Sequence, residues 1–311
     1  MSEKKYPAHF SQEDIKRIAA IEDWLKRNET SQAALARLAR ISGSALNQIL
    51  SGEYQSPPSK TLDKLESAIR NRDENKKNAV TTVETSVFKL VQTACDMARR
   101  YHNFSVVSAY VGTGKTYALK CYAKKYDNTF LIETKPSSNA LDFSSQLAFM
   151  VTKLDKRTME DCFNVIVDAL KDTDSLIIVD EAETVTPKVL HILRRIRDIA
   201  NIGIVLAGTE ALNALIKPQH GQFDQIRSRT MFWPPVVTGI IEEDAAALIQ
   251  AAFGDEDISD EFIKSLYKFS NGSARVLVEG LIAGVKEFRR DHDLTAKLVE
   301  AVAKQVLCLS V

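Results

Sequence analysis

The chain has 311 residues, and its 41 Lys and Arg side chains are balanced by 41 Asp and Glu, so its formal net charge is zero. This length is about twice that of a usual single domain and predicts a large core with at least one smaller domain. The hydrophobic fraction of 45% and the charged fraction of 26% are typical of a globular protein and exclude a disordered chain. Because the net charge is zero, any DNA-binding surface must be local.

The apolar runs have the length of strands, so the sequence predicts no membrane span. The first residues lack the apolar segment of a signal peptide, which favours a cytoplasmic protein. Four cysteines are scattered without a Cys-x-x-Cys pair, so we expect neither a zinc site nor a disulfide framework. They are Cys95, Cys121, Cys162 and Cys308.

Residues 1–70 have apolar side chains at helical spacing between turn formers, which predicts a small all-α domain. Within it, residues 32–52 match the helix-turn-helix pattern at most anchor positions. The anchors that would pack together are Leu35, Ala36, Ile41, Leu46 and Ile49. Arg40 stands where this motif usually has glycine, so it must adopt a left-handed conformation or the turn must shift.

The second helix of this motif would expose Ser44, Asn47, Gln48 and Ser51. These side chains form hydrogen bonds of the kind that suit base edges or phosphates, so we expect the first three to be DNA-binding candidates. A helical protein-interaction domain of the same shape remains an open alternative, because the segment has no strong basic excess.

The highly charged stretch 71–78 opens a predicted linker over residues 71–85. Beyond it, helices and strands alternate, which predicts a parallel sheet covered by helices. The expected helices are 83–101, 115–125, 142–154, 159–171 and 187–199, and the expected strands are 104–109, 129–133, 175–180 and 203–207. We place the nucleotide-binding core at 86–236 and a helical C-terminal lid at 237–311, where the strand signal stops.

A phosphate-binding loop follows the first strand of the core and opens a helix. Gly112 and Gly114 would let backbone N–H groups surround phosphate, Lys115 would place a charge on the outer phosphates, and the Thr116 hydroxyl would hold magnesium. The first glycine of the usual pattern is Ala109 here. The expected ATP-binding residues of the loop are Val111, Gly112, Thr113, Gly114, Lys115, Thr116 and Tyr117.

Two acids, Asp180 and Glu181, end the buried-strand run 176–180. Ligands bind at the carboxyl ends of such strands, so Asp180 would support Mg²⁺ together with Thr116. Glu181 would orient or deprotonate the attacking water. Thr209 follows the next strand, where a polar side chain would lie between the two catalytic strands, although it could also be a simple turn hydroxyl.

These motifs in this order resemble the AAA+ P-loop ATPases. The resemblance implies that Thr209 is the sensor 1 residue and that Arg275 is sensor 2. It also implies that Arg229 is an arginine finger, with Arg227 as second candidate. Such an arginine contacts the γ-phosphate bound by a neighbouring subunit. Hydrolysis would then depend on a homo-oligomer, either a filament or a ring. For Arg229 and Arg275 an ordinary surface arginine is the alternative.

The domain order and several local segments resemble the phage Mu B-type transposition proteins. The segments are 130–137, 147–149, 178–182, 202–208 and 274–277. The resemblance implies an α/β fold with an AAA+ core, an N-terminal helix-turn-helix domain and a helical lid. It further implies ATP and Mg²⁺ as cofactors, filaments on double-stranded DNA, selection of target DNA, and stimulation of an integrase-like transposase, in a bacterial cell or a phage-infected host.

Nonspecific binding to duplex DNA needs only basic side chains repeated along an assembly of subunits. The candidates are Lys153, Lys156 and Arg157, with Arg194, Arg195 and Arg197 behind them. Two other functions stay open: a helicase-loader or replication-initiator ATPase, and a transcription regulator switched by ATP. The partner bound and the DNA sequence preference would distinguish them.

Overall fold

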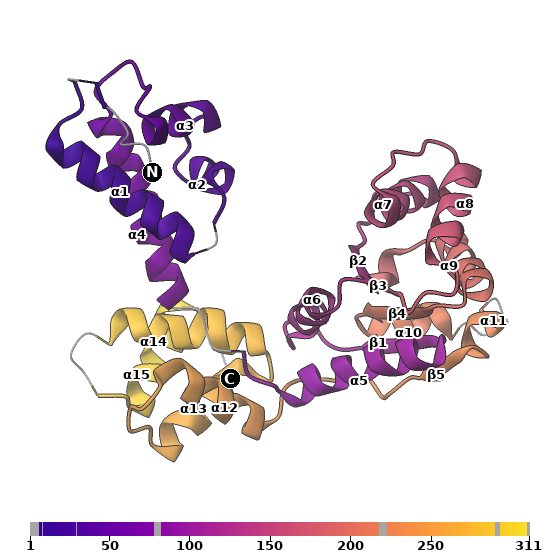
Figure 1. Cartoon of the computed structure of the whole chain (residues 1–311). Coiled ribbons are helices and arrows are strands. Elements are labelled where there is room, and N and C mark those ends of the chain that lie inside the picture. Colours follow the sequence, from indigo (N-terminus) through magenta and orange to yellow (C-terminus); the bar gives the residue numbers. More distant parts are fainter. Residues whose placement is uncertain are drawn as a thin grey trace. The chain divides into compact units, whose positions relative to one another are not determined.

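The computed structural model of the chain describes residues 6–7, 9–28, 30–77, 82–217, 223–289 and 293–309. The chain divides into two compact units, Met1–Val80 and Thr81–Val311 (Figure 1). No helix in these described ranges is long and apolar enough to cross a membrane.

Four helices form the first unit. They are α1 (Gln12–Arg27), α2 (Gln32–Leu38), α3 (Gly43–Ser51) and α4 (Ser59–Lys77). Serine side chains cap the first three helices, and Ser11 and Asp14 form a capping box at α1. Arg17 ties α1 to α4 through Asp63 and Glu66, at 2.6 and 2.7 Å. The helix α4 continues to Lys77, so the segment expected to be a linker begins as helix.

The helix-turn-helix motif consists of α2, α3 and the turn between them. Its anchors Leu35, Leu46 and Ile49 have no exposed surface, and Ile41 is half-buried against the same core. Arg40 has a φ of 53°, so the turn keeps its shape and the arginine adopts the left-handed conformation that glycine usually supplies.

A parallel sheet is the centre of the second unit. Its strands are β1 (Phe104–Ser108), β2 (Thr129–Glu133), β3 (Leu176–Asp180), β4 (Gly203–Gly208) and β5 (Thr230–Phe232), in the order β2-β3-β4-β1-β5. The helices of this core are α5 (Ser86–Tyr101), α6 (Lys115–Lys125), α7 (Ala140–Thr152), α8 (Met159–Leu170), α9 (Pro187–Ala200), α10 (Glu210–Ile216) and α11 (Asp224–Arg227).

The inner strands are buried on both faces because helices cover both. Every residue of β1, β3 and β4 is buried. Alternate side chains point to opposite faces of a strand, and in β3 Leu176 and Ile178 join one apolar cluster with α5 and α6, whereas Ile177 and Val179 join another with α7, α8 and α9. The continuous aliphatic run 176–179, which predicted a buried strand, is explained by helices on both faces of the sheet.

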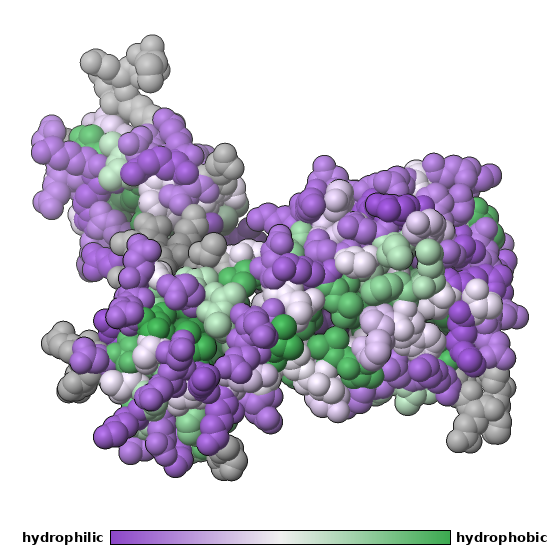
Figure 2. Space-filling model, turned by 90° about the horizontal axis from the view of Figure 1, so that it is seen from below, coloured by the Kyte–Doolittle hydropathy of each residue, from purple (hydrophilic) through white to green (hydrophobic). Residues whose placement is uncertain are grey.

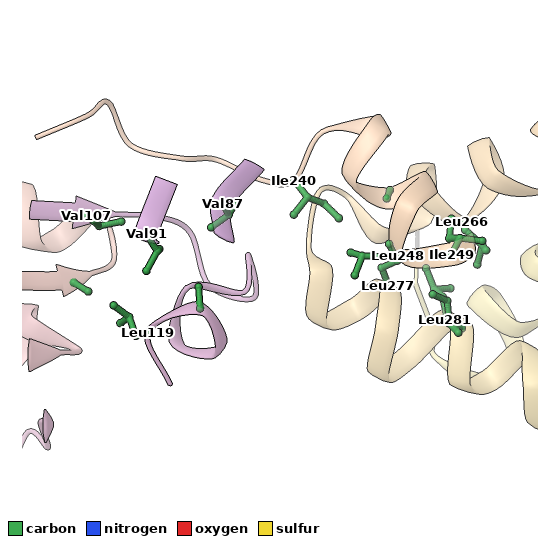
Figure 3. Packing of buried hydrophobic residues seen from close by; sticks show 14 of the residues in the cluster. Val87, Val91, Val107, Leu119, Ile240, Leu248, Ile249, Leu266, Leu277 and Leu281 are labelled. Carbon is green, nitrogen blue, oxygen red and sulfur yellow. The ribbon is translucent and has the colours of Figure 1, made fainter. Parts of the chain in front are cut away.

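The chain after β5 forms a helical lid. It contains α12 (Glu242–Phe253), α13 (Asp260–Ser270), a π-helical stretch (Val276–Ile282) that continues into α14 (Ala283–Phe288), and α15 (Ala296–Ala301) followed by a second π-helical stretch (Val302–Val306). Figure 3 shows its core side chains, among them Leu248, Leu266 and Leu281, beside Ile240. Asp244 of α12 accepts hydrogen bonds from the backbone N–H and hydroxyl of Ser86, which attaches the lid to α5.

The helices and strands predicted for the core are present, with ends within three residues of the expected ones. The sequence missed β5, α10 and α11, which are short. The three residues of β5 form a strand because they pair with β1, a tertiary contact without a local signal. Seen from below, the surface is mostly hydrophilic, with hydrophobic residues in separate patches (Figure 2), as expected for a globular protein.

Candidate nucleotide-binding and ATPase site

The predicted site residues meet at one edge of the sheet. Strand β4 lies between β1 and β3, and all three are parallel, so their carboxyl ends are neighbours. The phosphate loop follows β1, Asp180 ends β3, and Thr209 follows β4. This placement brings the loop and the acidic pair together on either side of Thr209.

The phosphate loop turns at two glycines in left-handed conformations. Gly112 has a φ of 82° and Gly114 a φ of 95°, which L side chains rarely adopt. Gly114 is the N-cap of α6, so free N–H groups and the positive end of the helix dipole face the loop. Ala109 is buried and its N–H donates to the Gly208 carbonyl at 3.0 Å, which extends β1 by one residue. Since Ala109 has no positive φ, an alanine fits there.

The Lys115 ammonium is buried at the sheet edge. Its Nζ donates to the carbonyl oxygens of Gly208 at 2.6 Å and Ala109 at 3.3 Å. Burial lowers the pKa of Lys115 below its ordinary value, and nearby carboxylates, Asp180 and Glu183 foremost, only partly offset this. The ammonium, beside the phosphate loop, can bind an anion with strong oxygen acceptors.

The magnesium candidates Thr116 and Asp180 touch each other. The Thr116 hydroxyl donates to Asp180 Oδ2 at 2.7 Å, and only 1% of the Asp180 surface is exposed. The other carboxylate oxygen accepts from the backbone N–H of Glu181 at 3.0 Å. The carboxylate is thereby fixed in orientation, with one oxygen directed at the start of α6.

Glu181 is exposed and sits in a constrained turn. Its φ of 55° is left-handed, which costs a non-glycine residue about 1–2 kcal/mol. The hydroxyls of Thr134 and Thr184 donate to its carbonyl oxygen at 2.8 and 2.9 Å, and Thr134 also donates to the Asp180 carbonyl. Strain of this kind accumulates at functional sites, where surrounding contacts hold it.

Sequence reasoning missed Thr134, Thr184 and Glu183 at this edge. Thr134 directly follows β2, a position at the carboxyl end of a strand that could have drawn attention to it. Glu183 packs on Gly208, where the absence of a Cβ leaves room for its carboxylate, and its Oε2 is buried without a hydrogen-bond partner in the described structure. Thr209 is the N-cap of α10, and no cap bond from its side chain is found, so its hydroxyl is available to the site.

The lid contacts the phosphate loop through the segment before its π-helical stretch. The backbone N–H of Arg275 donates to the Gly112 carbonyl at 2.9 Å. The Ser273 hydroxyl lies where a Cβ on residue 112 would stand, so glycine is required there for space as well as for φ. The Arg275 side chain is exposed, and its backbone lies beside the loop.

Arg229 lies at the opposite edge of the sheet from its own phosphate loop. Its carbonyl oxygen accepts a hydrogen bond from the N–H of Phe104, the first residue of β1, at 3.0 Å. The phosphate loop instead follows Ser108, the last residue of β1. The five residues of β1 separate Arg229 from the phosphate loop by roughly 15 Å. The Arg229 backbone therefore lies at the far end of β1 from the phosphate loop of the same chain. Arg227 is exposed and pairs with Asp224 at 3.0 Å.

The DNA-binding candidates lie on surfaces of both units. Ser44, Asn47 and Gln48 are exposed on α3. In the second unit, Lys153 and Arg157 are exposed in the connection between α7 and α8, where Lys156 is half-buried. On α9, Arg194 is half-buried, and Arg195 is exposed and stacks on Phe163. Arg197 is half-buried and donates hydrogen bonds to His102 and Asn103.

Comparison with known protein families identifies both units. The AAA domain family matches residues 98–216, and the helix-turn-helix family matches residues 21–73. The chain contains an AAA domain and is an ATPase. The first match contains the phosphate loop, the acidic pair and Thr209, and the second contains α2 and α3.

The homologues of this AAA ATPase include B proteins of Mu-like phages. The Mu-like prophage FluMu DNA transposition protein B of Haemophilus influenzae is 26% identical over 208 residues, which cover 64% of this chain and 71% of that protein. The ATP-dependent target DNA activator B of Escherichia phage Mu is 31% identical over 128 residues, 40% of this chain and 41% of that protein.

Solved structures share the fold of the AAA ATPase. A Walker-type ATPase of Pyrococcus abyssi matches with a TM-score of 0.53 and 13% identity, over 73% of this chain and 74% of that one. The origin recognition complex of Drosophila bound to DNA matches with a TM-score of 0.53 and 12% identity, over 74% of this chain and 63% of that chain. These likenesses concern the fold alone.

Proposed function

We propose that this AAA ATPase binds duplex DNA without sequence preference when it holds ATP, assembles on it as a filament, and delivers that DNA as a target to an integrase-like transposase. The observation that supports this most is the sheet edge where Lys115, Thr116 and Asp180 converge, in a chain whose homologues include a target DNA activator. The proposed place of action is the cytoplasm of a bacterial cell or phage-infected host.

ATP and Mg²⁺ fit the residues at this edge. One hydroxyl and one carboxylate, from Thr116 and Asp180, form a donor set that suits Mg²⁺, which keeps several waters and takes phosphate oxygens as further ligands. The ion would neutralise phosphate charge. Lys115 would bind the outer phosphates, and Glu181 would accept a proton from the attacking water.

Assembly follows from the position of Arg229. A guanidinium that cannot reach its own γ-phosphate can reach that of an adjoining subunit, where it would stabilise the charge that develops during hydrolysis. Arg275, beside the loop, would report nucleotide state to the lid. Hydrolysis would then release the assembly from DNA.

The filament is tested by electron microscopy of the full chain with duplex DNA. We expect continuous filaments with ATP and Mg²⁺ and none with ADP, because the γ-phosphate is the group that joins one subunit's nucleotide to the next subunit's Arg229. Monomers on DNA in the presence of ATP would refute the proposed assembly. A pull-down against a replicative helicase and against a transposase distinguishes the helicase-loader function from the proposed one.

The connection between α7 and α8 is the proposed DNA-binding surface of the core. Lys153 and Arg157 are exposed there. If each contacts one phosphate, replacing both by alanine lowers the slope of log K against log salt by about 1.8, at about 0.9 per lost contact. Fluorescence anisotropy of a labelled duplex at several salt concentrations measures this. The exposed lysines Lys124 and Lys264, replaced together, are the control, and an unchanged slope for the first pair would contradict the assignment.

A further inference from the structure

Arg229 is held by a network of side chains at the end of α9. Its Nε donates to Asp198 Oδ1 at 2.8 Å, and its Nη1 donates to the carbonyl oxygen of Gln225 at 2.7 Å. Asp198 belongs to α9 and Gln225 to α11, which lies beside α9 (Figure 1). Two elements separated in the sequence therefore fix the direction of one guanidinium.

Asp198 is itself held in place by Arg197. The Arg197 Nη1 lies 3.1 Å from the same carboxylate oxygen, Asp198 Oδ1. Arg197 is anchored in turn, because its Nε donates to the His102 carbonyl and its Nη2 to Asn103 Oδ1, each at 2.6 Å. The network thus rests on the turn between α5 and β1.

The network leaves donors and charge available. A guanidinium has five N–H groups, and in the described structure Arg229 uses its Nε and Nη1 but makes no hydrogen bond from Nη2. Two guanidinium groups around one carboxylate leave a net positive charge. The side chain of Arg229 is 31% exposed, so the free end can meet a ligand.

The carboxylate stays ionised in this position. Burial acts to raise the pKa of Asp198, but hydrogen bonds from Arg229 and Arg197, together with their charges, hold it below its ordinary value. A charged acceptor gives a stronger and more directional bond to arginine than a neutral one.

We infer that Asp198 is a positioning residue for hydrolysis, which directs the Nη2 end of Arg229 outward toward the nucleotide of an adjoining subunit. This inference rests on the proposed role of Arg229. Asp198 touches no nucleotide. Its effect is to hold Arg229 in the orientation that a γ-phosphate requires, so that this ordering does not have to occur during each turnover.

The first test compares single variants in ATP turnover at saturating ATP and DNA. For Arg229→Ala we expect turnover to fall on the order of a thousandfold, the effect of losing an arginine finger. For Asp198→Ala we expect a fall of roughly ten- to a hundredfold, the scale on which misplacing a group by an ångström slows a reaction. ATP affinity stays unchanged in both, and Asp198→Glu recovers part of the rate because it keeps the charged acceptor.

Matched controls come from the lid, where Arg289 and Glu256 form an ion pair at 2.5 Å and the arginine is also 31% exposed. Arg289→Ala and Glu256→Gln should leave turnover unchanged. Circular dichroism and thermal melting of all variants verify that each is folded.

The second test separates positioning of Arg229 from a role in the same subunit's site. Glu181→Gln subunits are expected to bind ATP but to hydrolyse it far more slowly, and they offer an intact Arg229. Mixed with Asp198→Ala subunits, whose own sites are intact, they should restore turnover, as they should for Arg229→Ala subunits.

The outcomes distinguish the two claims. Full turnover by Arg229→Ala refutes the arginine finger itself. Loss of turnover by Arg229→Ala but a normal or raised rate for Asp198→Ala overturns only the positioning role. If the mixture rescues Arg229→Ala but not Asp198→Ala, Asp198 acts within its own subunit and the inference is wrong.

Discussion

Replacement of Lys115 by alanine should abolish ATP binding in the working range of the protein. The ammonium is buried beneath the phosphate loop and bonds to two backbone carbonyls, so alanine removes the only charge that the loop itself offers to phosphate among its described residues 109–116. Charge-assisted hydrogen bonds contribute about 1.5–3 kcal/mol each, so we expect affinity to fall at least about a hundredfold.

Titration with a fluorescent ATP analogue measures this loss. The control is Lys124→Ala, which removes an exposed lysine from the same helix, α6, and should bind ATP normally. A thermal melt of the Lys115→Ala chain without nucleotide shows whether the fold survives. A folded variant with unchanged ATP affinity would be incompatible with the site described above.

Replacement of Glu181 by glutamine should separate ATP binding from hydrolysis. The amide has the shape of the carboxylate but cannot take a proton from water, and general-base catalysis typically contributes a factor of about 10²–10⁴. We therefore expect turnover to fall by about that factor while ATP affinity remains, because Lys115, Thr116 and Asp180 are unchanged. The ATP-bound assembly on DNA should persist for the same reason.

Phosphate release and retention of bound ATP are measured on the same sample. Glu261→Gln is a suitable control, since Glu261 is exposed in the first turn of α13, away from the sheet edge. Hydrolysis at the normal rate by Glu181→Gln would mean that another group activates the water. Glu183, whose Oε2 is buried without a hydrogen-bond partner in the described structure, would be the next to test.

Much of the site could be predicted because its residues directly follow strands. The β-type run 104–108 and the aliphatic run 176–179 indicate buried parallel strands, and the residues after them must lie at the carboxyl edge of the sheet. The glycine pattern of the phosphate loop requires left-handed backbone conformations, and Gly112 and Gly114 have them. For Arg40 the sequence left two possibilities, a left-handed conformation or a shifted turn, and the φ of 53° shows the first.

Contacts between distant segments had no local signal. The hydroxyl of Thr134 reaches the acidic turn 46 residues further along, and Ser86 meets Asp244 across 158 residues. The surroundings of Arg229 could not be predicted from the sequence either. The sequence does not reveal that Asp198 and Gln225 bind its side chain, or that it lies at the end of the sheet opposite the phosphate loop.

The sequence by itself predicted the chemistry proposed for this protein: which loop would hold phosphate, which acids would face it, and which helices form the helix-turn-helix. It could do so because these features depend on residues adjacent in the chain, through backbone conformation and the alternation of strand side chains. Only the tertiary structure decided how the acidic turn is fixed, how the lid meets Gly112, and what directs Arg229. Those contacts join residues that the fold alone brings within hydrogen-bonding distance, and local patterns do not specify such pairs.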